Sequence, residues 1–365
     1  MGDPRKAASA FKIEGALDTC QPLGEGNIHQ SYLIQTQSEA PRRYVLQQIN
    51  QSVFPQPDLI AENMKTVWEH YQNRPGNDYH WVFPEIISTS NDQPLHIDEE
   101  RNAWRLTRYI ENTRTCQVIE TPLLAEESGR ALGIFHRILS ELPASRIHVT
   151  LPGFHDSAGY LQQYDSVISQ FQPDSFGNEL RYCHEVIEAR RSLVKVLSDH
   201  AKPGALTTGI IHGDPKINNI LFDTKTHRAI GMIDLDTLMP APLLYDIGDA
   251  VRSGCNPGGE EETNLQNVRL DVDLFEALMK GYFREAAVLL NPLDRSLICD
   301  ACRLLTFELG LRFFADHLAG NRYFKVATPD QNLNRALVQF KLLEDIEAKK
   351  TQIRTIAKSG HQTWC

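Results

Sequence analysis

The segment IIHGDPKINNILF, residues 210–222, places two runs of bulky apolar residues on either side of a short polar loop. Apolar runs of strand length that are bounded by turn residues are typical of buried β-strands. The loop carries an imidazole, a carboxylate, an amine and an amide, on His212, Asp214, Lys216 and Asn219. Loops that a rigid core positions often carry catalytic groups, so these side chains are candidates for catalysis.

The sequence that continues from this loop, residues 218–236, predicts a β-hairpin because two apolar runs are joined by the polar turn DTKTHR. Asn219 begins the first run and Asp234 ends the second, so both should lie at the same end of the strand pair. An amide oxygen and a carboxylate oxygen are suitable ligands for a hard cation such as Mg²⁺. The hairpin therefore predicts a magnesium site, with Asp214 beside it as a separate base.

Composition limits the classes of protein to which this loop can belong. The chain has 365 residues, 41% of them hydrophobic, which is enough for a substantial core. A formal net charge of -10 argues against general binding to nucleic acid or to an anionic membrane. The N-terminus lacks the apolar core of a secretory signal, and no run is long enough to span a bilayer. The cysteines are scattered, and the one CxxC pair lies in a helical pattern, which indicates reduced thiols and a cytoplasmic location.

The pattern of the chain changes near residue 111. Before it, short β-type runs dominate, with one helical stretch over residues 57–73. After it, apolar residues recur at helical spacing in long segments. These segments are 157–170, 178–199, 271–289, 293–319 and 331–357. The sequence therefore predicts an α+β fold, with a mostly antiparallel sheet and a helix in residues 1–111 and a mainly helical part in residues 112–365.

The loop also fits a known catalytic scheme. His212, Asp214 and, five residues later, Asn219 match the H-x-D-x-x-x-x-N pattern of eukaryotic-type kinases. Residues 212–223, 233–257 and 309–326 resemble the aminoglycoside phosphotransferase-like kinases, and within them the bacterial N-acetylhexosamine 1-kinases. The resemblance implies a bilobal protein-kinase-like fold. Residues 1–111 would form the nucleotide-binding N-lobe, and residues 112–365 the C-lobe with the catalytic loop, the metal site and the acceptor-binding helices.

The resemblance also implies roles for single residues. Asp214 is the general base, which accepts the proton of a substrate hydroxyl as that hydroxyl attacks the γ-phosphoryl group of ATP. Asn219 and Asp234 are the Mg²⁺ ligands, and Lys216 stands where many protein kinases carry a lysine directed at the transferred phosphate. Asp236 is open to three interpretations: a second metal contact, a hydrogen bond to the substrate, or a structural carboxylate. Asp246, at the head of a predicted helix, is expected to anchor the catalytic loop.

The N-lobe shows one departure from the kinase pattern. Gly24 and Gly26 lie between two predicted strands, where backbone N–H groups would cover phosphates. On the next strand, alternation from Val45 places Gln47 where a lysine is expected. The usual lysine–glutamate pair therefore cannot form, and Glu62 on the following helix has no clear partner. Either an amide contacts the phosphates, as the sugar-kinase resemblance implies, or phosphate binding is impaired.

The remaining candidates concern adenine and the acceptor. Main-chain groups near Tyr109 and Ile110, at the expected hinge between the lobes, are predicted to bind adenine. Arg312 and Tyr323 are predicted to contact the acceptor, because an arginine would repel a cationic acceptor and suits the hydroxyls or acetamido carbonyl of a neutral sugar. A surface ion pair is the alternative for Arg312. His29 is a further candidate for a sugar contact.

We therefore predict an ATP-dependent, Mg²⁺-dependent kinase that phosphorylates the anomeric hydroxyl of N-acetylglucosamine or N-acetylgalactosamine. The first alternative is another kinase of the family, which acts on an amino alcohol, an aminoglycoside or another sugar. The second is a catalytically silent nucleotide-binding module, for which Gln47 is the only indication. The Gly- and Glu-rich segment 251–264 is either a lid over the acceptor site or a disordered loop.

Overall fold

The computed structural model of the chain describes residues 2–24, 28–37, 41–75, 79–172, 176–200, 202 and 204–359. The chain divides into two compact units. The first unit is formed by Met1–Thr113 together with two later segments, Leu142–Pro152 and Ile233–Met239. The second unit is formed by Arg114–Glu141, Gly153–Met232 and Pro240–Cys365. The sequence-predicted helix over residues 57–73 falls in the first unit and the later long helices fall in the second.

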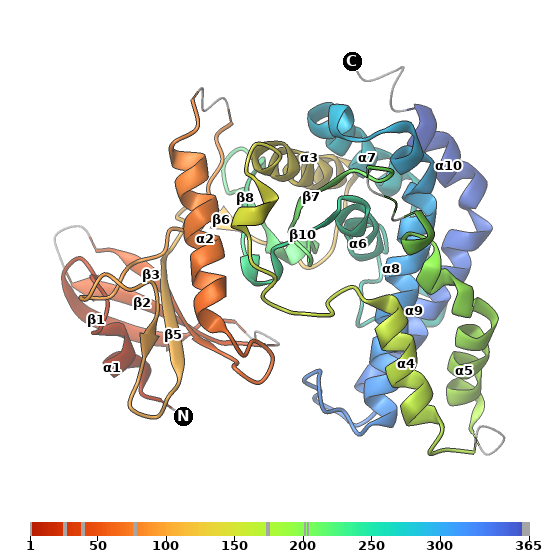
Figure 1. The fold of residues 1–365 in the computed structure, drawn as a ribbon, viewed down its shortest axis with the longest axis horizontal. Coiled ribbons are helices and arrows are strands. Elements are labelled where there is room, and N and C mark those ends of the chain that lie inside the picture. Colours follow the sequence, from red (N-terminus) through yellow and green to blue (C-terminus); the bar gives the residue numbers. More distant parts are fainter. Residues whose placement is uncertain are drawn as a thin grey trace. The chain divides into compact units, whose positions relative to one another are not determined.

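The first unit is built on an antiparallel sheet of five strands in the order β1-β2-β3-β5-β4 (Figure 1). The strands are β1 (Ala16–Pro22), β2 (Gln30–Gln37), β3 (Arg43–Ile49), β4 (His96–Ile97) and β5 (Ala103–Arg108). Side chains alternate between the two faces of a strand, so each strand presents one apolar set to the core. That set, which packs against Ala7, Ala8 and Phe11 from the region of α1 (Pro4–Ala8), is Ile34, Tyr44, Leu46, Trp104 and Leu106.

Helix α2 (Pro57–Gln72) confirms the helix predicted over residues 57–73. Its buried side chains include Ile60, Met64 and Val67, at the spacing of one helical face. The same helix buries Asn63, whose amide donates to His148 O at 2.8 Å and accepts from His148 N at 2.8 Å. This two-way hydrogen bond ties the segment Leu142–Pro152 to the first unit.

The second unit is mainly helical and is arranged around the long helix α8 (Pro292–Leu318) (Figure 1). Contacts join α8 to α4, α6, α9 and α10. The helices of this unit are α3 (Pro122–Leu139), α4 (Ser157–Ile168), α5 (Asn178–Arg190), α6 (Leu244–Gly254), α7 (Val272–Ala286), α8, α9 (Gln331–Ala348) and α10 (Lys350–Ser359). The predicted helix over 331–357 is thus two helices, and the one over 178–199 changes to a 3₁₀ turn, Arg191–Lys195, after α5.

Helices α3 and α7 pack so closely that glycine is required at two positions. A Cβ atom on Gly129 would lie 1.8 Å from the carbonyl oxygen of Leu278, and one on Gly281 would lie 1.9 Å from that of Glu126. No side chain can be accommodated at these distances from a backbone oxygen, so any substitution there would force the helices apart.

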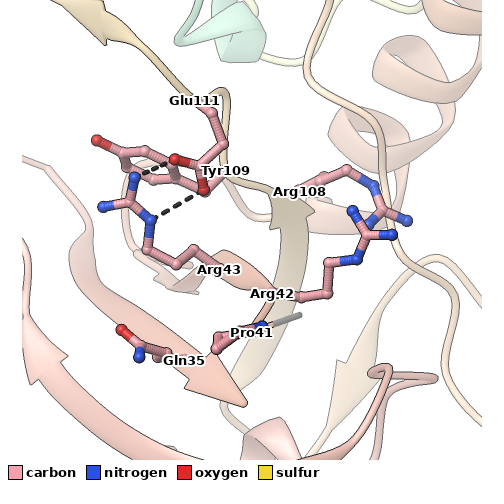
Figure 2. A pocket seen from close by; sticks show the side chains of 7 residues that line it. All are labelled: Gln35, Pro41, Arg42, Arg43, Arg108, Tyr109 and Glu111. Atoms are coloured by element: carbon pink, nitrogen blue, oxygen red, sulfur yellow. Dashed lines mark hydrogen bonds and ion pairs between the residues drawn. The ribbon is translucent and has the colours of Figure 1, made fainter. Parts of the chain in front are cut away.

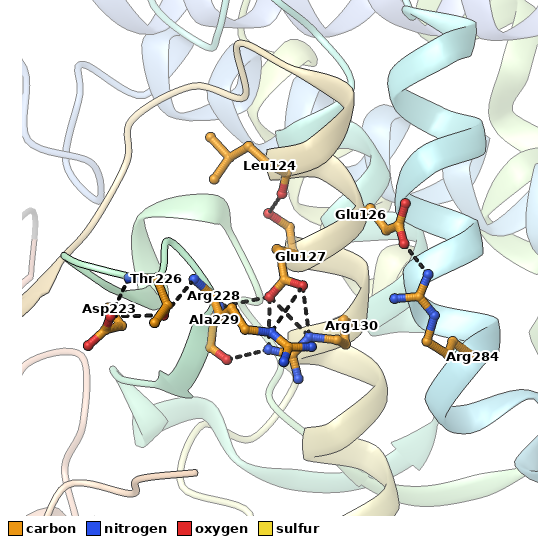
Figure 3. Close-up of polar contacts among 10 residues, drawn as sticks. Leu124, Glu126, Glu127, Arg130, Asp223, Thr226, Arg228, Ala229 and Arg284 are labelled. Carbon is orange, nitrogen blue, oxygen red and sulfur yellow. Dashed lines mark hydrogen bonds and ion pairs between the residues drawn. The ribbon is translucent and has the colours of Figure 1, made fainter. Parts of the chain in front are cut away.

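The hairpin predicted over residues 218–236 is confirmed. Strand β8 (Ile220–Asp223) pairs antiparallel with β9 (Ala229–Met232), with Ile220 opposite Met232. Figure 3 shows how α3 holds the hairpin: Glu127 accepts a hydrogen bond from the Ala229 N–H at 2.9 Å, and Arg130 donates to the Ala229 carbonyl at 2.6 Å. The remaining short strands are β6 (Thr113–Arg114), β7 (Thr208–Ile211) and β10 (Met239–Pro242).

Two further predictions can be compared with the structure. Cys299 and Cys302 lie on α8 as buried free thiols, which confirms them as core residues. The segment 251–264 is packed rather than disordered, since Glu260 pairs with Arg252 at 3.2 Å and Asn256 is buried, so that alternative was wrong. Within the described ranges, no helix combines the length and the hydropathy that crossing a bilayer demands.

Candidate active site

The catalytic loop is held from one side by a buried aspartate on α6. Asp246 accepts hydrogen bonds from the backbone N–H groups of His212 at 2.7 Å and Gly213 at 2.9 Å, and from His136 Nε2 at 2.9 Å. Burial alone would raise the pKa of Asp246, but the hydrogen bond and charge of His136 and the bond from His212 keep it below its ordinary value. Gly213 has a φ of 85°, which only glycine adopts without strain. The prediction that Asp246 anchors the loop is confirmed.

A second contact holds the loop from its carbonyl side. His155 Nε2 lies 2.8 Å from Gly213 O, and His155 Nδ1 lies 2.9 Å from Glu308 Oε1 on α8. Burial lowers the pKa of His155, but the Glu308 carboxylate more than offsets this and raises the pKa above its ordinary value. A protonated ring donates from both nitrogens, so His155 links α8 to the loop. Its ring also stacks on Tyr245, with centroids 5.1 Å apart.

The Asp214 carboxylate is suited to act as a base. Lys216 Nζ lies 2.8 Å from its Oδ2, and 27% of the Asp214 side chain is exposed, so a substrate can reach it. Burial would raise the pKa of Asp214, but Lys216, with smaller contributions from His212 and Arg252, brings it below its ordinary value. The carboxylate is therefore ionised at neutral pH and able to accept a proton.

The side chain of Asn219 is oriented by the same loop. Its Nδ2 donates to the Asp214 carbonyl at 2.8 Å, which leaves its Oδ1 as the atom that could bind a cation. Asp234 has a φ of 63°, a left-handed conformation that is uncommon outside glycine and often marks functional positions. Asp234 belongs to the first unit and Asn219 to the second, so their shared cation site stays a prediction.

The donor types nevertheless fit Mg²⁺. Among the residues that the structure describes, no three His, Cys, Asp or Glu side chains converge into a metal-binding group. Mg²⁺ is usually bound by only one or two protein oxygens, with water and substrate phosphates completing its octahedral shell. An Asn219 amide oxygen and an Asp234 carboxylate correspond to that kind of partial site.

Arg312 on α8 lies within a cage of aromatic rings. Its guanidinium carbon is 4.7 Å from the ring centroid of Tyr160, 5.4 Å from those of Phe154 and Phe324, and 5.5 Å from that of Tyr323. No hydrogen bond or ion pair joins the guanidinium to another residue in the described part of the chain, which argues against the surface ion pair.

The charge of Arg312 is nevertheless influenced by Asp214. Burial would lower its pKa, but Tyr160, Tyr323, Glu308 and Asp214 together raise it above the ordinary value. Arg312 is therefore a cation in the electrostatic neighbourhood of Asp214, with hydrogen-bond donors available for a ligand.

In the first unit, a buried polar network surrounds Gln47. Arg105 on β5 donates from Nε to Gln47 Oε1 at 2.9 Å and from Nη1 to Asp236 Oδ1 at 2.5 Å. Asp236 also lies 2.6 Å from His29 Nε2, while His29 Nδ1 accepts from Asn50 N at 3.0 Å. Burial alone would raise the pKa of Asp236, but Arg105 and His29 hold it well below its usual range. Both carboxylate oxygens of Asp236 and both ring nitrogens of His29 thus already have partners, which favours the structural interpretation of Asp236.

Tyr109 lies beside a cavity of about 390 Å³ at the ends of β3 and β5 (Figure 2). The ring of Tyr109 packs against the Arg43 guanidinium, 4.2 Å from its centroid, and Arg43 pairs with Glu111. The other two arginines of this cavity are also paired, Arg42 with Glu14 and Arg108 with Glu14 and Glu85. Each of the three arginines that line the cavity therefore already has a carboxylate partner.

Comparison with known proteins supports the resemblance noted in the sequence. The model of a family described as the phosphotransferase enzyme family matches residues 19–278, well over half of the chain. The chain belongs to this family. An H-x-D loop held by buried carboxylates is thus part of a phosphotransferase.

Solved structures show the same fold at low sequence identity. A microcompartment-associated aminopropanol kinase has a TM-score of 0.64 at 15% identity, covering 94% of this chain and 97% of its own. An aminoglycoside phosphotransferase from Alicyclobacillus acidocaldarius has a TM-score of 0.58 at 14% identity, and the match covers 99% of this chain and 96% of that protein. A choline/ethanolamine kinase family protein from Mesorhizobium loti has a TM-score of 0.56 at 17% identity, covering 97% of each chain. These structures confirm the predicted kinase-like fold, with a sheet-based first unit and a helical second unit.

The structure distributes the predicted site residues of this phosphotransferase over both units. The second unit contains Asp214, Lys216, Asn219, Arg312 and Tyr323. The first unit contains Gly24, His29, Gln47, Tyr109, Ile110, Asp234 and Asp236, while Gly26 lies outside the described residues. Sequence reasoning missed Arg105, His155 and Glu308. Arg105 could have been noticed, because it stands between Trp104 and Leu106 in a strand that is buried on both faces.

Glu62 illustrates the departure from the kinase pattern. Its carboxylate lies 3.3 Å from His148 Nε2, and both side chains are about half exposed. The helix glutamate therefore pairs with a surface histidine in the first unit, whereas Arg105 and Asp236 form a buried ion pair in the same unit.

Proposed function

We propose that this phosphotransferase is an ATP-dependent sugar kinase that transfers the γ-phosphoryl group to the anomeric hydroxyl of an N-acetylhexosamine, either N-acetylglucosamine or N-acetylgalactosamine. The family membership supports phosphoryl transfer to a small molecule. The resemblance of residues 212–223, 233–257 and 309–326 to N-acetylhexosamine 1-kinases supports the sugar and the position of its phosphate.

The observation that carries the choice of acceptor is the environment of Arg312. Its guanidinium is caged by aromatic rings and lacks a carboxylate partner in the described part of the chain, yet it is near enough to Asp214 for the two charges to interact. A cation whose charge interacts with that of the base would repel an acceptor that carries an ammonium group. It would favour a neutral acceptor whose hydroxyl or acetamido oxygens accept hydrogen bonds, with Tyr323 offering a ring face to the sugar.

The residues of the loop, with Asp234 of the first unit, would have separate roles in the transfer. Asp214 accepts the proton of the acceptor hydroxyl as its oxygen attacks the γ-phosphorus, and Lys216 holds the carboxylate ionised before transfer. Asn219 and Asp234 would bind Mg²⁺, which when bound neutralises charge on the phosphate oxygens. Asp246 and His155 hold the loop rigid so that the base stays aligned.

The nucleotide would be bound by groups of the first unit. Gln47 would donate an N–H to a phosphate oxygen, and the backbone around Gly24 and Gly26 would cover the phosphates. Gly24 has a φ of 67°, which suits a tight glycine turn. Main-chain groups near Tyr109 and Ile110 would contact adenine. His29 and Asp236 are not included among the ligand contacts, because Asn50, Arg105 and each other already occupy their polar atoms.

One observation favours a second candidate, a kinase that acts on an amino alcohol or an aminoglycoside. Asp249 Oδ2 is buried and has no hydrogen-bond partner among the described residues, and a carboxylate oxygen of this kind could accept from an ammonium group. Arg252 donates to Asp249 Oδ1 at 2.7 Å, however, so the charge of Asp249 is already balanced.

A panel of acceptors tests the proposal. ATP consumption should be measured with N-acetylglucosamine, N-acetylgalactosamine, glucose, an aminoglycoside, choline and an amino alcohol, and any sugar phosphate should be identified by ³¹P and ¹H NMR. The proposal predicts turnover with the N-acetylhexosamines and phosphate on the anomeric oxygen. Preferential turnover of a cationic acceptor would support the second candidate, and absence of turnover with nucleotide still bound would support a silent module.

A further inference from the structure

Arg105 occupies an unusual place in the first unit. It lies on β5 directly opposite Gln47 on β3, and only 2% of its side chain is exposed. Opposed residues of antiparallel strands project from the same face of the sheet, with Cβ atoms roughly 4.5–5.5 Å apart. Arg105 therefore brings a positive charge to the sheet face on which position 47 has no charge.

The Nε donor of Arg105 determines the orientation of the Gln47 amide. A guanidinium can only donate, so Gln47 Oε1 must face Arg105 Nε and the amide nitrogen must point away from it. One N–H of that nitrogen donates to Ser31 Oγ on β2 at 3.1 Å. Gln47 is thus held with its donor group turned away from the arginine. This is the orientation that a phosphate contact requires, because phosphate oxygens only accept.

The Nη1 donor of Arg105 holds the segment that carries Asp234. Arg105 pairs with Asp236, which comes two residues after Asp234 and which also accepts from His29. The same short segment is fixed through its backbone, because the Thr150 hydroxyl donates to the Asp236 carbonyl at 2.5 Å. The left-handed backbone of Asp234 is therefore followed, two residues later, by the buried and fully paired side chain of Asp236.

We propose that Arg105 is a positioning residue for phosphoryl transfer, which orients the Gln47 amide toward ATP and holds Asp234 in place through Asp236. This inference rests on the proposed function, in which Gln47 contacts a phosphate and Asp234 binds Mg²⁺. An arginine–aspartate pair thereby takes the place of the missing lysine–glutamate pair. Residues that orient a metal ligand from behind typically change metal affinity about 10–100-fold when mutated.

Two single variants separate the contact of Arg105 with Gln47 from its contact with Asp236. Arg105→Lys keeps a positive charge for Asp236 but lacks the planar fork that also reaches Gln47, so it should raise the KM for ATP about 10-fold and change the Mg²⁺ requirement little. Asp236→Asn removes the charge that holds the segment, so it should raise the Mg²⁺ concentration for half-maximal binding about 10-fold. Calorimetric titration of AMP-PNP at varied Mg²⁺ measures this without any acceptor, and steady-state kinetics give the KM.

A double-mutant cycle and a control complete the design. Adding Gln47→Ala to Arg105→Lys should raise the KM for ATP no further, because both changes remove the same contact. Arg190→Lys is the matched control, since Arg190 pairs with Glu347 at 2.9 Å in the second unit. It should lower the midpoint of thermal unfolding without changing the KM or the Mg²⁺ requirement. If Asp236→Asn does not fold, the positioning role is tested by the Arg105→Lys measurements and by the double-mutant cycle of Arg105→Lys with Gln47→Ala.

The outcomes distinguish this inference from the proposed function. Folded Arg105→Lys and Asp236→Asn proteins with wild-type KM and Mg²⁺ requirement would overturn the positioning role. If those two variants behaved like the wild type but Asn219→Ala raised the Mg²⁺ requirement, the proposed function would stand and only the positioning role of Arg105 would be lost. A wild-type protein that binds AMP-PNP independently of Mg²⁺ would overturn both.

Discussion

Replacing Asp246 with asparagine tests whether the catalytic loop depends on a single buried charge. The substitution keeps the size of the side chain but removes the carboxylate that accepts three hydrogen bonds at 2.7–2.9 Å. Its Oδ2 accepts from both His212 N and His136 Nε2, so the amide oxygen of the variant should remain there. The amide nitrogen then faces the Gly213 N–H, donor against donor.

The magnitude follows from these contacts. A buried donor left without an acceptor costs about 1–3 kcal/mol, and each of the two retained bonds weakens by roughly 1 kcal/mol when its acceptor loses its charge. Asp246→Asn should therefore lower the free energy of unfolding by about 3–5 kcal/mol at neutral pH. The pKa of Asp246 is depressed in the folded protein, so its contribution exists above the unfolded pKa of about 3.9 and is lost as the pH falls through the folded pKa.

Urea titration followed by tryptophan fluorescence measures the stability, and initial rates under conditions where the variant is folded measure kcat. We expect kcat to fall at least about 10-fold, because a shifted loop misaligns the base. Asp294→Asn is the control: Asp294 is also fully buried and accepts from Thr207 N at 3.0 Å and Asn291 N at 2.9 Å, and neither donor belongs to the loop of residues 212–219. The Asp294→Asn protein should have a lower free energy of unfolding than the wild type and an unchanged kcat. An Asp246→Asn protein with the urea midpoint and kcat of the wild type would refute the reasoning.

Asp214→Asn should reduce kcat by roughly 10²–10⁴-fold while nucleotide affinity, measured by calorimetry, stays within a few-fold; full activity would exclude Asp214 as the base. Lys216→Ala should shift the acid limb of the kcat/KM profile to higher pH, because burial then raises the pKa of Asp214 without the opposing ammonium; an unmoved limb would contradict this. Asn219→Ala and Asp234→Ala should each raise the Mg²⁺ requirement in a titration, since each removes an oxygen ligand. Arg312→Ala should lower kcat/KM for the sugar by a factor that corresponds to about 1–3 kcal/mol of transition-state free energy, with the KM for ATP unchanged. Comparing N-acetylglucosamine, N-acetylgalactosamine and glucose shows whether the guanidinium serves the acetamido group, and unchanged values for all three would remove Arg312 from the site.

The sequence by itself determined the local elements on which the site is built. Alternating apolar residues predicted the strands of the first unit, and apolar residues at helical spacing predicted α2 and the long helices of the second, because each period places one face of the element against the core. The hairpin after the loop and the role of Asp246 were also predicted correctly. These features involve residues that are close in the chain or types that a local pattern identifies.

Only the tertiary structure decided which distant side chains support that site. The Arg105–Asp236 pair joins positions 131 residues apart, and the His155–Glu308 pair joins positions 153 residues apart. The cage around Arg312 likewise combines Tyr160 on α4 with Tyr323 after α8. A buried charge is stable only with a partner, yet nothing in a local pattern says which of many carboxylates or rings will supply it. The packing of the folded chain makes that choice, and so the sequence predicted the base while the fold selected the groups that hold it.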